Sequence, residues 1–168
     1  MGGVTVHDDR LLYELLALEA AQAGLSWRTI LRKRENFKKD FDNFDVAKVA
    51  SFGETERQRL LTDAGIVRNR LKIDAVISNA QHYLEVQREF GSFDKYVWQF
   101  TGNKTLRSPG VITFDNMPTF TPESATMSKD LKKRRFRFVG PTICYVWMQG
   151  IGMVNDHLTS CFCAPLEA

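Results

Sequence analysis

The sequence has few cysteines, no long apolar run and only a small excess of charge. Three cysteines among 168 residues are an odd number, which argues against a disulfide framework and for reduced thiols or a metal site. No apolar stretch approaches the length needed to cross a bilayer, and the first residues lack the charged and apolar regions of a secretory signal. No internal repeat or low-complexity tract is found. We therefore expect a cytoplasmic protein with no membrane association.

The positive charges are segregated along the chain rather than mixed with the negative ones. The balance of 23 Lys and Arg against 20 Asp and Glu, a net +3, is too small to indicate nucleic-acid binding by itself. Residues 28–39 nevertheless carry six basic side chains against one acidic one, and residues 129–137 repeat that ratio. Each run is compatible with a nucleic-acid contact and equally with an ordinary solvated helix face.

The hydrophobic pattern is helical almost throughout. At 43% hydrophobic residues, the chain is long enough for one well-filled domain, and we predict a single domain over residues 1–168. The spacing predicts an all-α fold of about eight helices. Residues 101–122 break the pattern with several prolines and form one long irregular connection. Asp8 or Asp9, Asp45, Ser92 and Ser124 are the expected helix caps, and Gly91 an expected helix end.

Glu19 lies at an unusual place on the first predicted helix. Leucines precede it by three, four and seven residues, so at helical spacing the carboxylate falls on the apolar stripe. One interpretation is that Glu19 lies at the edge of the stripe and reaches water or a neighbouring side chain. The other is a desolvated carboxylate that faces a pocket and reserves its hydrogen-bonding capacity for a ligand.

Trp27 and Gln22 favour the second interpretation. A flat ring just beyond the helix end at Gly24, and an amide three residues after the carboxylate, form a plausible set for holding a planar polar ligand. Trp27 is equally explained as a core anchor, which is the commoner role of a tryptophan. Ser26 can cap the helix that begins at Trp27.

Residues 60–72 read as a helix, a tight turn at Gly65 and a second helix. The first N–H groups of the second helix and the basic residues near it suit a phosphate oxygen, as in a helix-hairpin-helix that holds a DNA backbone. The common form of that motif has a glycine where Val67 stands here. A plain helical hairpin therefore remains an open alternative.

Several blocks of the sequence together resemble one family. In matching order, these blocks are similar to the bacterial DNA-3-methyladenine glycosylase I family, from about residue 4 to residue 163. They are Leu18-Glu19, Gln22 to Trp27, Lys33 to Phe37, Asp63 to Ile66, Phe138-Val139-Gly140 with Thr142, and Met153 to His157.

The resemblance implies an all-α helix-hairpin-helix DNA glycosylase fold, with the hairpin over about residues 55–90. It also implies a monofunctional enzyme that hydrolyses the N-glycosidic bond of N3-methyladenine in duplex DNA, releases the free base and starts base excision repair. No cofactor is expected for that chemistry, and a monomer is expected. The residues that would correspond to the family's site are Glu19 as the catalytic, base-recognising carboxylate, Trp27 and Gln22 at the base, and Gly24, Leu25, Ser26, Gly65, Ile66, Val67 and Arg68 at the DNA.

The sequence also departs from the family's pattern. Members normally have an N-terminal segment before the position of Val4, with aromatic pocket residues and two ligands of a structural zinc; that segment is missing here. His157 and Cys161 match the C-terminal ligand pair, which is half of the usual set of about four. The two side chains could equally be packed residues near the C-terminus. An alternative function follows, a catalytically weakened DNA-binding or base-binding domain.

Overall fold

The computed structural model of the chain describes residues 4–22 and 27–156, apart from residues 109, 111, 112, 114 and 117, and leaves the side chains of Gln22 and Trp27 undescribed. Within this part of the chain there are eight α helices, two short 3-10 turns and no strand, since the pairing of Leu106 with Val154 is an isolated bridge. The predicted all-α fold is confirmed.

The helices follow one another with short connections until residue 101. Their bounds are α1 Asp9–Gln22, α2 Trp27–Asp40, α3 Val46–Ala50, α4 Glu54–Thr62, α5 Arg70–Phe90, α6 Phe93–Trp98, α7 Pro122–Lys133 and α8 Pro141–Gly150. The 3-10 turns are Asp42–Phe44, after α2, and Gln99–Thr101, after α6.

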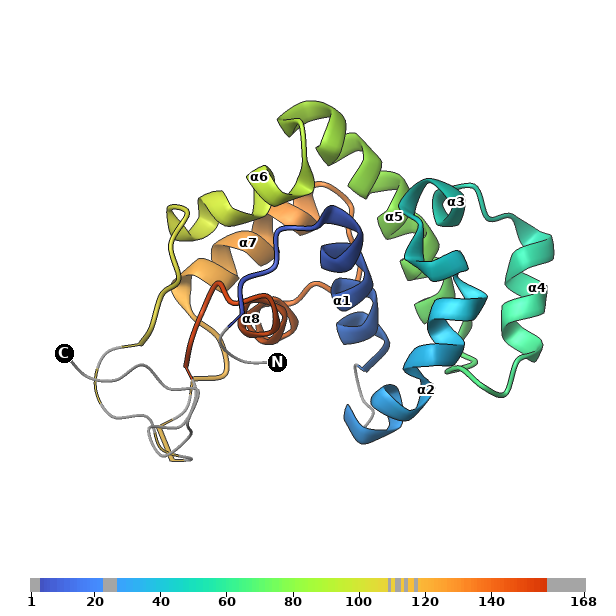
Figure 1. Ribbon diagram of the computed structural model, residues 1–168, viewed down its shortest axis with the longest axis horizontal. Coiled ribbons are helices and arrows are strands. Elements are labelled where there is room, and N and C mark those ends of the chain that lie inside the picture. The colour runs from blue at the N-terminus through green and yellow to red at the C-terminus, as the bar shows by residue number, and fades with distance from the viewer. Residues whose placement is uncertain are drawn as a thin grey trace.

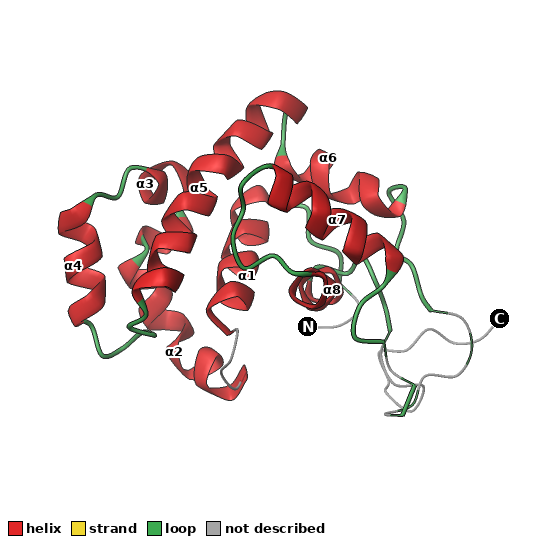
Figure 2. Cartoon of the chain, turned by 180° about the vertical axis from the view of Figure 1, so that it is seen from behind, coloured by secondary structure: helices red, strands yellow, loops and turns green. Residues whose placement is uncertain are grey.

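Helix α1 lies between two groups of helices, α2 to α5 on one side and α6 to α8 on the other (Figure 1). The view from behind shows the same division (Figure 2). α1 contacts α2 and α5 in the first group and α6 and α8 in the second. A side chain on α1 can therefore face a space bounded by helices from both groups.

Two buried aromatic side chains fix α1 in this central position. The hydroxyl of Tyr13, on α1, donates to the carbonyl of Val76 on α5 at 2.9 Å. The indole nitrogen of Trp147, on α8, donates to the carbonyl of Leu12 on α1 at 3.2 Å. Both rings are almost completely buried, so each hydrogen bond also satisfies a polar group that water does not reach. α1 is thus a rigid support for the residues near its C-terminal end.

Most of the predicted helix boundaries are confirmed by their hydrogen bonds. Asp8 accepts from the N–H of Leu11, Asp45 caps α3, and Ser92 caps α6. Gly91 ends α5 with a φ of 88°, a left-handed conformation that favours glycine. The prediction that Ser124 caps a helix is wrong.

Thr121 is the cap of α7, one turn earlier than predicted. The Thr121 hydroxyl accepts from the N–H of Ser124 at 3.2 Å, and the Ser124 hydroxyl accepts from the N–H of Thr121 at 2.9 Å. Pro122 occupies the first helical position, where its missing N–H is not needed. Ser124 therefore belongs to a reciprocal capping pair inside the first turn of the helix.

The connection between α6 and α7 is attached to the segment that follows α8. The buried carboxylate of Asp156 accepts from the main-chain N–H of Ser108 at 2.6 Å and from the hydroxyl of Tyr145 at 2.7 Å. Leu106 pairs with the main chain of Met153 and Asn155. Phe120, near the end of this connection, is exposed. Among the described helices, none is both long and apolar enough to span a membrane.

Candidate functional site

Glu19 is buried on the apolar face of α1, as one of its two interpretations required. Its side chain is only 6% exposed, and the leucines at positions 12 and 16 on the same helix are 0% and 1% exposed. The interpretation of a solvated glutamate at the edge of the stripe is therefore wrong. The Oε2 atom of Glu19 has no hydrogen-bond partner within the described part of the chain. Burial raises the pKa of this carboxyl from 4.5 to about 7.

Glu19 faces a cavity of about 300 Å³ formed by three helices. Its described lining comes from α1, α2 and α8 and is apolar except for two charged side chains, Glu19 and Arg34. The lining residues are Leu15, Leu18, Glu19, Ile30, Leu31, Arg34, Trp147 and Gly150. The volume is at the lower end of the roughly 300–1,000 Å³ typical of small-molecule sites. The cavity is suited to a small planar molecule that makes one strong polar contact.

A second acidic residue of α1, Glu14, has the opposite environment. Its side chain is 1% exposed, and both carboxylate oxygens are paired. Arg34, from α2, donates to Oε2 at 2.6 Å, and Arg10, one turn earlier on α1, donates to Oε1 at 3.2 Å. Arg34, the cation of the described cavity wall, is thus paired with Glu14, whereas one oxygen of Glu19 has no partner among the described residues.

The turn between α4 and α5, residues 63–69, is held against α2. The Nζ atom of Lys33 donates to the carbonyl of Ala64 at 3.0 Å, and the side chain of Asn36 lies over Gly65. A Cβ atom at Gly65 would lie 2.9 Å from Oδ1 of Asp63 and 3.0 Å from Nδ2 of Asn36. A side chain at this position would therefore displace the Asp63 and Asn36 side chains. α2 therefore positions both one wall of the cavity and the hairpin turn.

Val67 occupies its place in the hairpin without strain. It is not among the described residues with a positive φ, so the turn does not need a glycine at this position. Ile66 is buried and anchors the turn, while Arg68 is exposed. The N–H groups of Val67 and Arg68 have no hydrogen-bond partner within the described residues. The turn thus offers main-chain donors and a cation at the surface.

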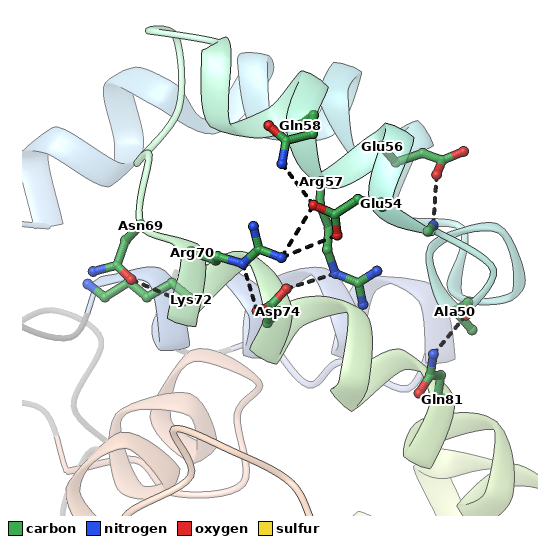
Figure 3. Close-up of polar contacts among 11 residues, drawn as sticks. Ala50, Glu54, Glu56, Arg57, Gln58, Asn69, Arg70, Lys72, Asp74 and Gln81 are labelled. Atoms are coloured by element: carbon green, nitrogen blue, oxygen red, sulfur yellow. Dashed lines mark hydrogen bonds and ion pairs between the residues drawn. The ribbon is translucent and has the colours of Figure 1, made fainter.

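Charged groups connect helix α4 to α5. Helix α4 buries only one apolar residue, Leu60. Figure 3 shows the polar contacts: Arg57 donates to Asp74 at 2.8 Å, and Arg70 pairs with Glu54 at 3.2 Å and with Asp74 at 3.7 Å. These partly exposed ion pairs join the two helices of the hairpin.

The hairpin is also connected directly to the end of α1. Lys72, in the first turn of α5, donates from Nζ to the carbonyl of Ala21 at 2.9 Å. Ala21 is two residues beyond Glu19 and precedes the undescribed residues 23–26. One hydrogen bond therefore joins the hairpin helix to the segment that carries the buried carboxylate.

Several predicted site residues lie outside the described structure. Gln22 ends α1 and Trp27 begins α2, so both flank the cavity helices, but their side chains are not described. Gly24, Leu25 and Ser26, and the candidate zinc ligands His157 and Cys161, are not described either. The described residues contain no cluster of three or more side chains that could hold a metal ion. The base-contacting, DNA-contacting and zinc-binding roles of these residues stay predictions.

Of the described cavity lining, sequence reasoning singled out only Glu19. Arg34 belongs to the basic run over residues 28–39, and its spacing of four from Ile30 was the signal that could have distinguished it. Trp147 and Gly150 come from α8, more than a hundred residues from Glu19. No local pattern could have placed them beside it.

Comparison with known proteins gives the same family for almost the whole chain. The family described as methyladenine glycosylase matches residues 2–164. DNA-3-methyladenine glycosylase 1 of Escherichia coli strain K12 is 46% identical over 163 residues, which are 97% of this chain and 87% of that protein.

Solved structures agree in fold as well as in sequence. A crystal structure of 3-methyladenine DNA glycosylase I has a TM-score of 0.92 at 46% identity and covers 98% of this chain and 90% of its own. A second such enzyme, a tyrosine-to-phenylalanine variant in complex with 3-methyladenine, has the same TM-score at 34% identity and covers 99% and 89%. The predicted glycosylase fold is confirmed.

Proposed function

Because this chain belongs to the methyladenine glycosylase family, we propose that it excises 3-methyladenine from alkylated duplex DNA with Glu19 as the carboxylate that binds the extruded base. One observation carries the assignment to Glu19. It is a buried carboxylate, with an unpaired oxygen, in the described lining of a cavity between α1, α2 and α8. Buried polar atoms are nearly always paired, so an unpaired one marks a group kept for a ligand.

The chemistry of the lesion fits this arrangement. Alkylation at N3 gives adenine a positive charge and makes it a good leaving group, so the enzyme mainly needs to extrude, bind and orient the base. A carboxylate in an apolar cavity forms a charge-assisted hydrogen bond to the cationic base, and it gains far less from neutral adenine. Water then completes the hydrolysis of the N-glycosidic bond. Residues 63–69 contain no lysine, so no amine of the hairpin turn is available for strand cleavage through a Schiff base.

We assign the DNA backbone to the hairpin turn. The unpaired N–H groups of Val67 and Arg68 and the exposed Arg68 side chain suit a phosphate, with Gly65 and Ile66 shaping the turn. Gly24, Leu25 and Ser26 are proposed to contact the duplex where the base leaves it, and Trp27 and Gln22 to contact the base.

The remaining assignments concern partners and location. The substrate is duplex DNA containing alkylated adenine, and the product is the free base. The named relative is bacterial, and bacterial DNA lies in the cytoplasm, where we propose that this enzyme acts as a monomer. The chemistry requires no cofactor. A structural zinc held in part by His157 and Cys161 remains a proposal, to be checked by metal analysis of the purified chain.

The proposed function is tested by release of free 3-methyladenine from methylated duplex DNA. The unchanged chain should release the base, and Glu19→Gln should retain DNA binding but lose at least ~90% of excision, since one charged hydrogen bond contributes about 1.5–3 kcal/mol. Glu85→Gln, on an exposed face of α5, is the matched control and should excise normally. Normal excision by the Glu19 variant would remove Glu19 from the site.

A further inference from the structure

Two carboxylates on α1 are buried almost equally but differ in their partners. Glu14 has both oxygens bound by arginines, whereas Glu19 has an oxygen with no partner among the described residues. A buried carboxylate normally recruits a cation, because an unpaired buried charge is costly. This difference needs an explanation, because the cation of the cavity wall, Arg34, is paired with Glu14 and not with Glu19.

Arg34 is paired with Glu14 and shares a cavity wall with Glu19. It lies in the wall of the same cavity as Glu19, and it is the one cation in that described lining. Its side chain is 28% exposed, and its guanidinium is held by Glu14 at 2.6 Å. A guanidinium without this partner would be attracted to the remaining free carboxylate of the cavity, where a bidentate contact is favourable.

We propose that Glu14 is a positioning residue that holds the Arg34 guanidinium away from Glu19 and so keeps the Glu19 carboxyl available to the base. The inference rests on the proposed function, because it takes Glu19 as the acceptor of that base. A free guanidinium in the cavity would occupy the carboxylate of Glu19 and would also repel alkylated adenine. Glu14 prevents both effects by neutralising the cation in place.

Arg10 also contacts Glu14 but is not part of the described cavity lining. It binds the other oxygen of Glu14 and also donates to the carbonyl of Asn43 at 2.9 Å, outside the described cavity lining. It contributes to holding Glu14 but has no route to Glu19. Variants of Arg10 therefore test the support of Glu14 alone, whereas variants of Arg34 test the effect of the cation on the cavity.

The experiment measures binding of free 3-methyladenine and titration of the Glu19 carboxyl by ¹³C NMR in the full chain. In Glu14→Gln the freed Arg34 should pair with Glu19, so we expect base binding at least tenfold weaker and a Glu19 titration midpoint well below that of the unchanged chain. Glu14→Gln with Arg34→Gln removes the freed cation and should restore both quantities toward those of the unchanged chain. Arg10→Gln should change base binding by less than twofold.

A role of Glu14 in folding alone predicts different results. The Glu14 variant would then bind the base weakly with an unchanged Glu19 midpoint, and the double variant would be no better; either outcome overturns the proposal. If Glu14→Gln does not fold by circular dichroism, Glu14→Asp keeps the charge but withdraws it by one methylene, and should lower base binding and the midpoint by a smaller amount. If neither base binding nor the Glu19 midpoint changes in the Glu14 variant, the proposal is overturned as well.

Failure of the proposed function is a separate result. It would appear as an inability of the unchanged chain to bind 3-methyladenine. In that case the Glu19 midpoint in the Glu14 variant still decides whether Glu14 controls Arg34.

Discussion

Replacing Glu19 by glutamine should stabilise the folded chain at neutral and alkaline pH while it greatly lowers excision. The carboxyl of Glu19 is 6% exposed and its Oε2 atom is unpaired within the described residues, so its ionised form is disfavoured in the folded state. Glutamine has nearly the same shape and no charge to desolvate. A binding group kept unpaired for a ligand thus lowers stability.

The expected size and pH range follow from the pKa of Glu19. Burial raises that pKa from 4.5 to about 7, and one pH unit corresponds to about 1.4 kcal/mol, so the full effect is about 3 kcal/mol. The folded chain holds the proton more tightly than the unfolded chain. The protonated Glu19 carboxyl therefore contributes its full stability below pH 4.5. This contribution falls as the pH rises from 4.5 through about 7 and is absent above that. Glu19→Gln removes this loss.

The assay is urea unfolding of the two chains at several pH values. The free energy of unfolding of Glu19→Gln, minus that of the unchanged chain, should rise by about 2–3 kcal/mol between pH 5 and pH 8. The comparison must be a difference, because burial also raises the pKa of Asp40, to about 6. Both chains contain Asp40, so its contribution cancels. Glu35→Gln, at an exposed site with no ion pair among the described residues, should show no pH-dependent difference.

A difference between Glu19→Gln and the unchanged chain that is the same at pH 5 and pH 8 would refute this reasoning. It would mean that the carboxyl of Glu19 is ionised at little cost in the folded chain. The cavity would then be wet and polar, and the argument for selective binding of a cationic base would fail.

Two further predictions concern the cavity and the hairpin. A Cβ atom at Gly150 meets nothing within 4 Å, so Gly150→Leu should change stability by less than about 1 kcal/mol. The added side chain fills the cavity and should weaken 3-methyladenine binding at least tenfold in a fluorescence titration. Unchanged binding would place the base elsewhere. Asp74→Asn weakens the ion pairs of Arg57 and Arg70 and should cost about 0.5–1.5 kcal/mol in urea unfolding, less in 1 M salt; a cost that does not fall with salt would contradict an ionic attachment of α4.

The local features of the fold could be predicted from the sequence because each depends on neighbouring residues. The leucines around Glu19 predicted its burial, and Asp45, Ser92 and Gly91 predicted helix ends from side-chain capping and glycine geometry. The error at Ser124 has a local cause. Thr121 and Ser124 can both cap a helix, and only the backbone shows which of the two lies outside it.

The candidate site could be predicted only in part, because a cavity is a tertiary feature. Glu19 could be singled out because a carboxylate interrupts a leucine pattern. Trp147 and Gly150 approach it through the packing of α8, and the commitment of Arg34 to Glu14 depends on how α2 crosses α1. The pattern of either helix alone does not contain that crossing. The glycine at position 65 was recognised as a turn, but its physical reason, the approach of Asn36 from another helix, required the structure.

The most direct test of the account is a titration of the ¹³C-glutamate-labelled chain with free 3-methyladenine, with the Glu19 carboxyl signal assigned by its absence in Glu19→Gln. The account predicts that this signal moves as the base binds, with the same saturation as the binding curve, and that Glu19→Gln binds the base at least tenfold more weakly. A base that binds the unchanged chain and the Glu19 variant equally, while the Glu19 carboxyl signal stays in place, would contradict it.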